Sequence, residues 1–454
     1  MSMESIAYYH EQLKNRSTTV SQSLEGFLSR IENRRSLNTL ISMDFESARQ
    51  RARLLDETAN PDFSSLPLFG IPFVVKDNIH VKGFANTAGT PGLMGFHPLE
   101  DHSAVSKLRD AGAIIIGKAN MHELAMGITS NNAFSGAVAN AHDPKKIAGG
   151  SSGGSAAAIA DGQALASLGT DTGGSVRIPA ALNGICGFRP SSGRYTQKRV
   201  TPISSTRDTV GPMAKTVPDL ALIDRVISGD AALPDLNGHS IRLGVPREYF
   251  FAELNEELTQ ATEKALERLA AGGVTLVDVE LPGLSERLQK ASFPIVFNEL
   301  KALLENYLSE FKTGVSFNEL ITQIASPDVE QVFRVLEDPQ VVGKDVYQTA
   351  LDARHVLTAT YSDLLHQHRL HGIVFPTTPL AATDIQSSDE SVELNGQSAP
   401  TFNTFIRNTD LSSIVGSPSI TMPCGQTEAG MPLGLEIDGV IGGDRELLAV
   451  ASTV

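Results

Sequence analysis

The sequence contains only two cysteines, Cys186 and Cys424, among its 454 residues. Two thiols are too few for a disulfide framework or a zinc cluster, so a reduced, cytoplasmic location is the default expectation. No apolar run approaches the roughly 20 residues that a membrane-spanning helix needs, and the polar N-terminal residues do not resemble a signal peptide. The chain therefore predicts no membrane partner.

Basic residues are in the minority, since 37 Lys and Arg stand against 52 Asp and Glu, for a net charge of −15. A nucleic-acid partner needs a basic face and is not expected. The P-loop string is missing as well, because Lys145 and Lys146 precede the glycines of the chain's Gly-rich stretch instead of following them. The Rossmann string is also absent after any expected strand, so nucleotide binding is disfavoured.

The order of expected elements predicts an α/β fold. A buried strand that ends at Lys76 is followed by a helix over 104–111 and a strand over 113–120, which is the pattern of a β-α-β unit. Further strands are expected at 164–169, 239–246, 274–281, 372–379, 418–425 and 432–439. We expect a short helix over 121–127 and a loop over 201–217. One domain over 1–454 is expected, with an N-terminal helical segment (1–65) and a helical excursion or cap (285–370).

Residues 149–190 form a stretch rich in Gly, Ser and Ala with hardly any charge. Residues 150–154 fit G-x-S-x-G, which would make Ser152 the nucleophile of an α/β-hydrolase. That motif requires a strand before the serine, and the preceding residues 143–150 are expected to be a loop. We therefore reject Ser152 as the nucleophile.

A second serine, Ser175, follows a short expected strand and opens an expected helix. The backbone N–H groups of Thr172, Gly173 and Gly174 are therefore expected to point together as an oxyanion hole beside its hydroxyl. Considered alone, this string is more often a glycine turn with a serine helix cap. The other residues of the pattern favour the catalytic interpretation.

That pattern resembles the amidase signature family. It consists of GGSSGGSAAAIA, GTDTGGSVRIPAALNGICGFRP and the upstream PFVVKDNI with TAGT. Lys76 and Ser151 lie 75 positions apart, and Ser151 and Ser175 lie 24 apart, as the corresponding family residues do. The resemblance extends from about residue 20 to the end and is weakest in the middle helical region. It implies a large mixed sheet with helices on both faces.

The resemblance also implies a catalytic triad in which Ser175 is the nucleophile, Ser151 the relay in a cis peptide bond, and Lys76 the base. A lysine can act as a base only when it is neutral, so its ordinary pKa of about 10.4 must fall. The apolar residues before Lys76 predict the burial that lowers it. Because the chain supplies nucleophile, base and oxyanion donors, no metal and no cofactor is expected.

Finer matches resemble the branch of indoleacetamide and mandelamide hydrolases, although Asn183 and Ser205 replace the Cys and His that are usual there. Met126, Phe402 and Ile406 are candidates for the substrate pocket. The expected substrate is a small arylacetic-type amide. Hydrolysis of anilides, carbamates or aliphatic amides, and a glutaminase-like subunit of an amidotransferase, remain alternatives. Beyond the substrate, a homodimer is the one partner that we keep as an option.

Overall fold

A computed structural model describes residues 5–58, 60–236 and 240–453. Its centre is a mixed sheet of eleven strands, which confirms the predicted α/β class. In spatial order the strands are β1 (Leu40–Met43), β3 (Ile114–Ala119), β2 (Pro72–Lys76), β4 (Ala166–Asp171), β6 (Thr209–Ala214), β5 (Cys186–Arg189), β12 (Ser419–Gln426), β13 (Pro432–Gly439), β9 (Gly372–Pro376), β7 (Arg242–Val245) and β8 (Thr275–Asp278). Strand β2 runs parallel to β3 and β4, whereas β4 pairs antiparallel with β6.

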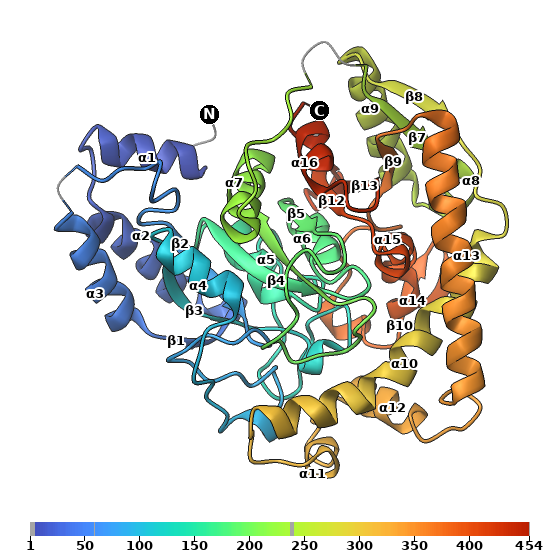
Figure 1. Ribbon diagram of the computed structural model, residues 1–454, viewed down its shortest axis with the longest axis horizontal. Helices are drawn as coiled ribbons and strands as arrows, with labels where there is room; N and C mark the ends of the chain where they lie inside the picture. The colour runs from blue at the N-terminus through green and yellow to red at the C-terminus, as the bar shows by residue number, and fades with distance from the viewer. Residues whose placement is uncertain (1–4, 59, 237–239, 454) are drawn as a thin grey trace.

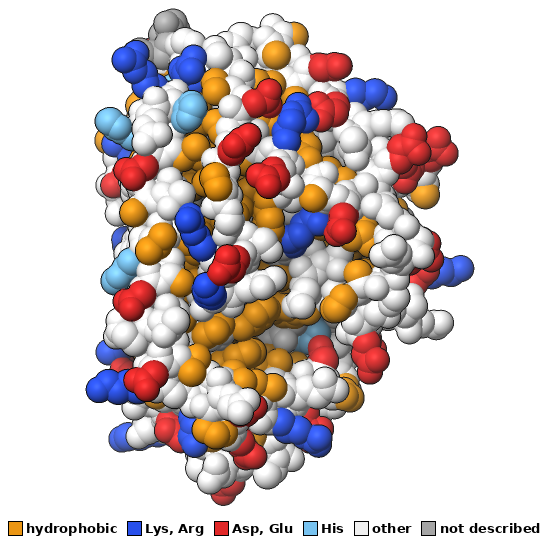
Figure 2. All heavy atoms as spheres, turned by 90° about the vertical axis from the view of Figure 1, so that its right-hand side faces the viewer, with side chains coloured by type: hydrophobic (Ala, Val, Ile, Leu, Met, Phe, Trp, Pro, Cys, Tyr) orange, Lys and Arg blue, Asp and Glu red, His pale blue; other side chains and the backbone are white. Residues whose placement is uncertain are grey.

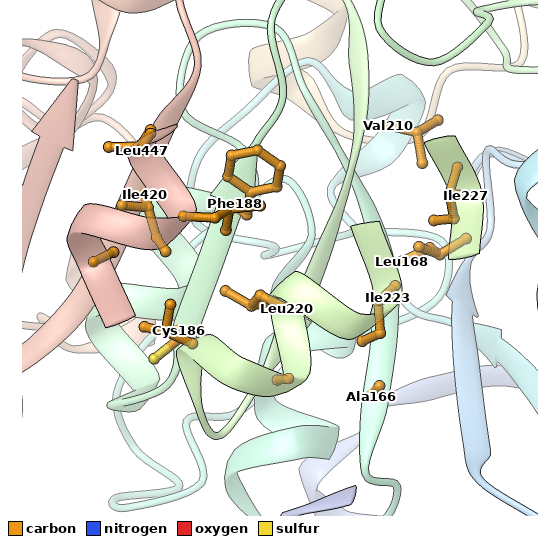
Figure 3. Close-up of a cluster of buried hydrophobic side chains, with 14 of the residues drawn as sticks. Ala166, Leu168, Cys186, Phe188, Val210, Leu220, Ile223, Ile227, Ile420 and Leu447 are labelled. Carbon is orange, nitrogen blue, oxygen red and sulfur yellow. The ribbon is translucent and has the colours of Figure 1, made fainter. Parts of the chain in front are cut away.

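Helices cover both faces of this sheet (Figure 1). The helices that share the larger core are α1 (Ile6–Lys14), α4 (Ser103–Asp110), α7 (Val217–Ser228), α9 (Glu256–Ala271) and α16 (Asp444–Thr453). The helices that share the second core are α2 (Val20–Asn33), α3 (Phe45–Asp56), α5 (Gly153–Ala160) and α6 (Arg177–Asn183). Figure 3 shows part of the larger core, where Leu220 and Ile223 of α7 face Phe188 and Ala166 of the sheet.

Alternation along β2 decides where its last side chain lies. Phe73 and Val75 belong to the larger core, and Val74 belongs to the core that contains α5. Since successive side chains of a strand point to opposite faces, Lys76 lies on the same face as Val74. The base candidate is thereby directed toward the Gly-rich segment that leads into α5.

The segment 285–370 is helical, as the sequence predicts. It contains all but the first residue of α10 (Leu284–Glu310) and three more helices, α11 (Phe317–Ile321), α12 (Pro327–Val335) and α13 (Lys344–His368). Figure 1 shows α13 along one side of the molecule and α10 running beneath the sheet toward α11 and α12. The two long helices pack on each other and on β9 and α15 (Asp410–Val415). The role of the segment 285–370 as a cap stays a prediction.

The remaining elements are short. They are η1 (Arg35–Leu37), η2 (Pro91–Leu93), η3 (Glu123–Ala125), α8 (Arg247–Phe250), η4 (Ile385–Ser387), the hairpin β10 (Ser391–Leu394) with β11 (Gln397–Pro400), and α14 (Thr401–Ile406). Within the described ranges, no helix has the length and apolar character to cross a membrane.

Three expectations were wrong. The expected loop 201–217 contains β6, a central strand of the sheet, and the N-terminal segment contains β1 as well as helices. The expected helix 121–127 is only the single turn η3, because Leu124 and Ala125 adopt positive φ angles of 50° and 60° that end a helix. Residues 1–4, His239 at the start of an expected strand, and Val454 lie outside the described residues.

Candidate active site

Lys76 ends β2 at a fully buried position, since its exposed fraction is 0%. Its Nζ lies 2.7 Å from Ser151 Oγ and 2.8 Å from Thr170 Oγ1. Burial lowers the pKa of Lys76 from 10.5 to about 7, although the negative charges of Asp171 and Asp208 oppose the shift. At neutral pH a substantial fraction of this amine is therefore unprotonated and able to accept a proton.

Ser151 lies in the segment that enters α5, and the peptide bond between Gly150 and Ser151 is cis. The Ser151 side chain is fully buried. Its carbonyl oxygen accepts a hydrogen bond from the backbone N–H of His122 at 3.1 Å. A Cβ atom on Gly150 would come within 3.0 Å of the Ser130 backbone, so the neighbouring chain leaves no space for a side chain there. Ser151 is thus held between Lys76, which contacts its hydroxyl, and His122, which donates to its carbonyl.

Ser175 lies in the turn between β4 and α6, and 8% of its surface is exposed. The backbone N–H of Ser152 donates to the Ser175 carbonyl oxygen at 3.2 Å, which joins the two Gly-rich segments directly. Ser175 also lines the cavity described below. The fold thus brings Ser175, the nucleophile candidate, beside Ser152, which directly follows the relay candidate Ser151.

Asp171 holds the turn that carries Ser175. Its carboxylate accepts hydrogen bonds from the backbone N–H groups of Gly174 at 2.9 Å and Val176 at 3.1 Å. Arg177 and Arg189 also donate to it. Burial alone would raise the pKa of Asp171, but the two guanidinium groups outweigh burial and hold that pKa well below its usual range. The turn is therefore fixed by a buried, charged network.

This network changes the expected oxyanion hole. Helix α6 begins at Arg177, two residues later than expected from the sequence. The Gly174 N–H is already committed to Asp171, so it is not a free donor as the sequence suggested. Thr172 and Gly173 both line the cavity beside Ser175. These two residues remain the candidates for oxyanion donors.

A cavity of about 410 Å³ lies against Ser175. Met126, Phe402 and Ile406, the pocket candidates from the sequence, all line it. The lining residues that the sequence did not suggest include Ile128, Ile203, Phe293, Val296, Phe297 and Val332. The Phe293 ring lies 5.8 Å from the Phe297 ring and 5.7 Å from the Phe402 ring, measured between centroids. The cavity wall is mainly apolar and partly aromatic.

The comparisons with known proteins identify the family. The Amidase family model matches residues 22–448. The chain belongs to the amidase family. It is 40% identical to an indoleacetamide hydrolase from Agrobacterium vitis, over 99% of this chain and 96% of the relative. It is 41% identical to a mandelamide hydrolase from Pseudomonas putida, over 97% and 89% of the two chains. These matches confirm the predicted family and make the chain an amide-cleaving hydrolase.

Solved amidase structures share the fold. A crystal structure described as an amidase has a TM-score of 0.85 and 33% identity, over 99% of this chain and 98% of the other. A peptide amidase from Stenotrophomonas maltophilia has a TM-score of 0.80 and 25% identity, over 99% and 96% of the two chains. The mixed sheet predicted from the resemblance is therefore the sheet of this enzyme family.

The single charged residue that lines the cavity among the described residues is Arg207. Its Nε donates to the Thr172 carbonyl at 3.0 Å, its Nη1 donates to Ser292 O and Oγ at 3.1 and 2.9 Å, and its Nη2 donates to the Asp410 carboxylate. Every nitrogen of this guanidinium therefore has a partner, and its charge is balanced by Asp410. The cavity of this amidase offers no free charge to a carboxylate of a substrate.

The rejected candidate Ser152 is fully buried and lies outside the cavity lining. Its Oγ donates to the Thr170 carbonyl at 3.2 Å, and it makes no side-chain cap on α5. The two departures from the branch also lie outside the lining: Asn183 bonds the carbonyls of Ala148 and Pro179, and Ser205 is exposed. Neither departure contacts the space where a substrate would fit.

Sequence reasoning missed Thr170 and Asp171, since the expected strand ended at residue 169 whereas β4 runs to Asp171. The two extra residues deliver one hydrogen-bond partner to Lys76 and one to Arg177. Cys186 and Cys424 are buried, and burial raises the pKa of both thiols to about 12. In the described part of the chain, no three His, Cys, Asp or Glu side chains come together as a metal site.

Proposed function

We propose that this amidase hydrolyses small primary amides of the arylacetic type to a carboxylic acid and ammonia through an acyl-enzyme on Ser175. The single observation that carries the proposal is the buried contact of 2.7 Å between Lys76 Nζ and Ser151 Oγ, together with a pKa near 7 for that lysine. The chemistry needs a base that is neutral at working pH, and burial supplies it.

In the first half-reaction, neutral Lys76 takes the proton of the Ser151 hydroxyl as Ser151 takes the proton of Ser175. The Ser175 oxygen attacks the amide carbonyl carbon, and the N–H groups of Thr172 and Gly173 stabilise the negative oxygen that forms. The C–N bond then breaks as the proton on Lys76 returns through Ser151 to the leaving nitrogen, which departs as ammonia. Water repeats the sequence on the acyl-enzyme, and the acid is released.

The acyl preference rests on the cavity and on the relatives. An apolar wall with several phenylalanines and no free charge suits a neutral aryl group. The relatives named for indoleacetamide and mandelamide hydrolysis are each about 40% identical to the chain. A glutaminase-like role fits this wall less well, because glutamine carries charged groups that would find no free partner there.

The decisive test is covalent labelling followed by mass spectrometry of the peptides. Phenylmethanesulfonyl fluoride should add to Ser175 in the wild-type protein and in Ser152→Ala, and no adduct should form in Ser175→Ala. An adduct on Ser152 would contradict the assignment of the nucleophile.

A panel of amides tests the substrate class with the same protein. Phenylacetamide, indole-3-acetamide and mandelamide should exceed anilides, carbamates and aliphatic amides in kcat/KM. A tenfold advantage for anilides or carbamates, about 1.4 kcal/mol, would assign another acyl or leaving-group preference and leave the triad in place. The cytoplasmic location and the homodimer stay predictions, and light scattering on the purified chain tests the second.

A further inference from the structure

Glu123 connects the catalytic core to the N-terminus of α12. Its fully buried carboxylate accepts hydrogen bonds from the backbone N–H of Ser326 at 2.7 Å and from that of Ala325 at 3.1 and 3.2 Å. Thr90 Oγ1 donates to the same carboxylate at 2.7 Å. These donors place the Glu123 carboxylate at the N-terminus of α12, the positive end of the helix.

The neighbouring residue makes a second connection to the same helix. His122 Nε2 lies 2.8 Å from Asp328 Oδ2, in the first turn of α12. The His122 ring also packs against Gly127, where a Cβ atom would lie only 2.2 Å from the ring. Gly127 lines the cavity, so the ring supports the cavity wall from behind.

The backbone of this dipeptide reaches the catalytic residues directly. The His122 N–H donates to the Ser151 carbonyl at 3.1 Å. The residues that follow, from Ala125 to Ile128, line the cavity. One short segment therefore contacts the relay serine, lines the cavity and bonds to the helix that carries Val332 of the same lining.

Helix α12 contributes to the cavity through Val332. Its buried face carries Val329 and Phe333, which pack in one cluster with Met121, Leu124 and Met126. A nine-residue helix has little intrinsic stability, and its position depends on these contacts and on the bonds at its N-terminus. Figure 2 shows hydrophobic side chains lining a recess in the lower half of the face that carries α10, α12 and α13.

We propose that His122 and Glu123 are positioning residues that hold α12 as a wall of the acyl cavity. This inference rests on the proposed function only in its claim that the acyl group occupies the cavity. If the two connections are weakened, α12 can move away from a bulky acyl group. The acyl group then loses the binding energy of its contact with Val332. The His122 N–H bond to Ser151 belongs to the backbone and survives side-chain substitution, so the chemical step is retained.

The test compares Asp328→Asn with Glu330→Gln on the same helix. Asp328 makes the pair with His122, whereas Glu330 pairs only with Arg334 on the surface. For Asp328→Asn we expect KM for phenylacetamide to rise about fivefold, KM for propionamide to change less than twofold, and kcat for both amides to stay within twofold. Glu330→Gln should change none of these values. Equal increases in KM for the two amides, or no increase, would overturn the proposal.

Hydrogen exchange measured by mass spectrometry supplies a readout that does not depend on the substrate. Exchange of residues 327–335 should be at least threefold faster in Asp328→Asn than in the wild type, and unchanged in Glu330→Gln. Should no arylacetamide be hydrolysed by the wild-type protein, the proposed function fails while this measurement still decides the positioning role. Unchanged exchange in Asp328→Asn contradicts it.

Two further variants separate the pair from general damage to the fold. His122→Asn combined with Asp328→Asn should show no greater exchange than either single variant, because both remove the same contact. Glu123→Gln keeps the side-chain volume but directs an NH₂ group at backbone donors, so we expect it to increase exchange and KM more than Asp328→Asn does. Additive effects of His122→Asn and Asp328→Asn would show that the two residues act separately and would overturn the pair.

Discussion

Lys76 Nζ and Ser151 Oγ lie 2.7 Å apart, and neither side chain has any surface exposed to solvent. A charged ammonium in this place loses its hydration and is only partly compensated by Asp171 and Asp208. The neutral amine needs no such compensation, and it can accept a proton from Ser151 while it donates to Thr170 Oγ1 at 2.8 Å. The same contact that buries the lysine therefore prepares it as a base.

The pH dependence of kcat/KM follows from this burial. The folded-state pKa of Lys76 is lowered to about 7, so the reactive neutral form dominates above that pH and the protonated form below it. We expect kcat/KM to be level on the alkaline side and to fall about tenfold per pH unit below pH 7. Lys76→Arg, which cannot become neutral, should be inactive throughout. A level profile down to pH 5 would exclude Lys76 as the base.

Thr170 should influence the pH at which kcat/KM falls. Its Oγ1 accepts hydrogen bonds from Lys76 Nζ at 2.8 Å and from Asn78 Nδ2 at 3.1 Å. Thr170→Val removes an acceptor that favours the ammonium form, so the pKa of Lys76 should fall further and the acid limb should move to lower pH. The buried Asn78 amide also loses its partner, at a cost of about 1–3 kcal/mol of folding free energy.

Thr170→Ser is the matched control, because it keeps the hydroxyl. Its acid limb should stay at the wild-type position, and its midpoint of urea unfolding should stay close to that of the wild type. A shift of the limb to higher pH in Thr170→Val would mean that the hydroxyl favours the neutral amine instead.

The loss of kcat on substitution should differ among the three serines according to their roles. Ser175→Ala removes the nucleophile and should reduce kcat by at least about 10⁴-fold. Ser151→Ala should reduce kcat less, because a water molecule in the space of the hydroxyl can carry the proton to Lys76. Ser152→Ala should reduce kcat least, since the Ser152 Oγ bonds only the backbone of Thr170. Steady-state rates with one amide check the order, and a Ser151 effect as large as that of Ser175 would assign Ser151 an irreplaceable role.

How much of this could be predicted from the sequence depends on how local each signal is. Lys76, Ser151 and Ser175 were found because their spacing and flanking glycines lie in continuous strings. Strand β6 was missed because Pro212 lacks an N–H and argues against a central strand. In the structure Pro212 pairs with Leu168 of β4, whereas β5 pairs only with Met213 and Ala214 of β6, so the missing N–H removes no bond to β5.

The cavity walls were harder to predict than the triad. Phe293 and Val332 come from helices more than 100 residues beyond Ser175, and their periodic apolar pattern is the same as that of core residues. Asp171 was missed because the strand was expected to end at residue 169, whereas β4 continues to Asp171. Its role depends on Arg189 and on Arg177, whose partners Ser412 and Glu436 lie over 200 residues away. No local pattern reports such pairing.

The turn before Ser175 should not tolerate a side chain at Gly174. Its φ angle is 130°, and a Cβ atom there would lie 2.2 Å from Thr409 Oγ1 and 2.8 Å from Ile178 Cδ1. Gly174→Ala must displace either Thr409 or the turn, so we expect a loss of about 10²-fold in kcat. Gly193→Ala is the control, because Gly193 has a φ of 84° and no atom within 4 Å of the added Cβ. Equal losses in the two variants would show that backbone strain, and not the contact with Thr409, causes the effect.

Phe293 should decide how strongly the enzyme prefers an aryl acyl group. Its half-buried ring lines the cavity between the rings of Phe297 and Phe402. Burying an aryl group against such a ring contributes about 1.5–3 kcal/mol, so Phe293→Ala should lower the ratio of kcat/KM for phenylacetamide over propionamide by about 10- to 100-fold. The value for propionamide itself should change little, because a short acyl group does not reach α10. Phe293→Leu keeps an apolar wall without the ring and should give an intermediate ratio. If the ratio stays at the wild-type value in Phe293→Ala, the aryl group binds elsewhere and the proposed arylacetic preference loses its structural basis.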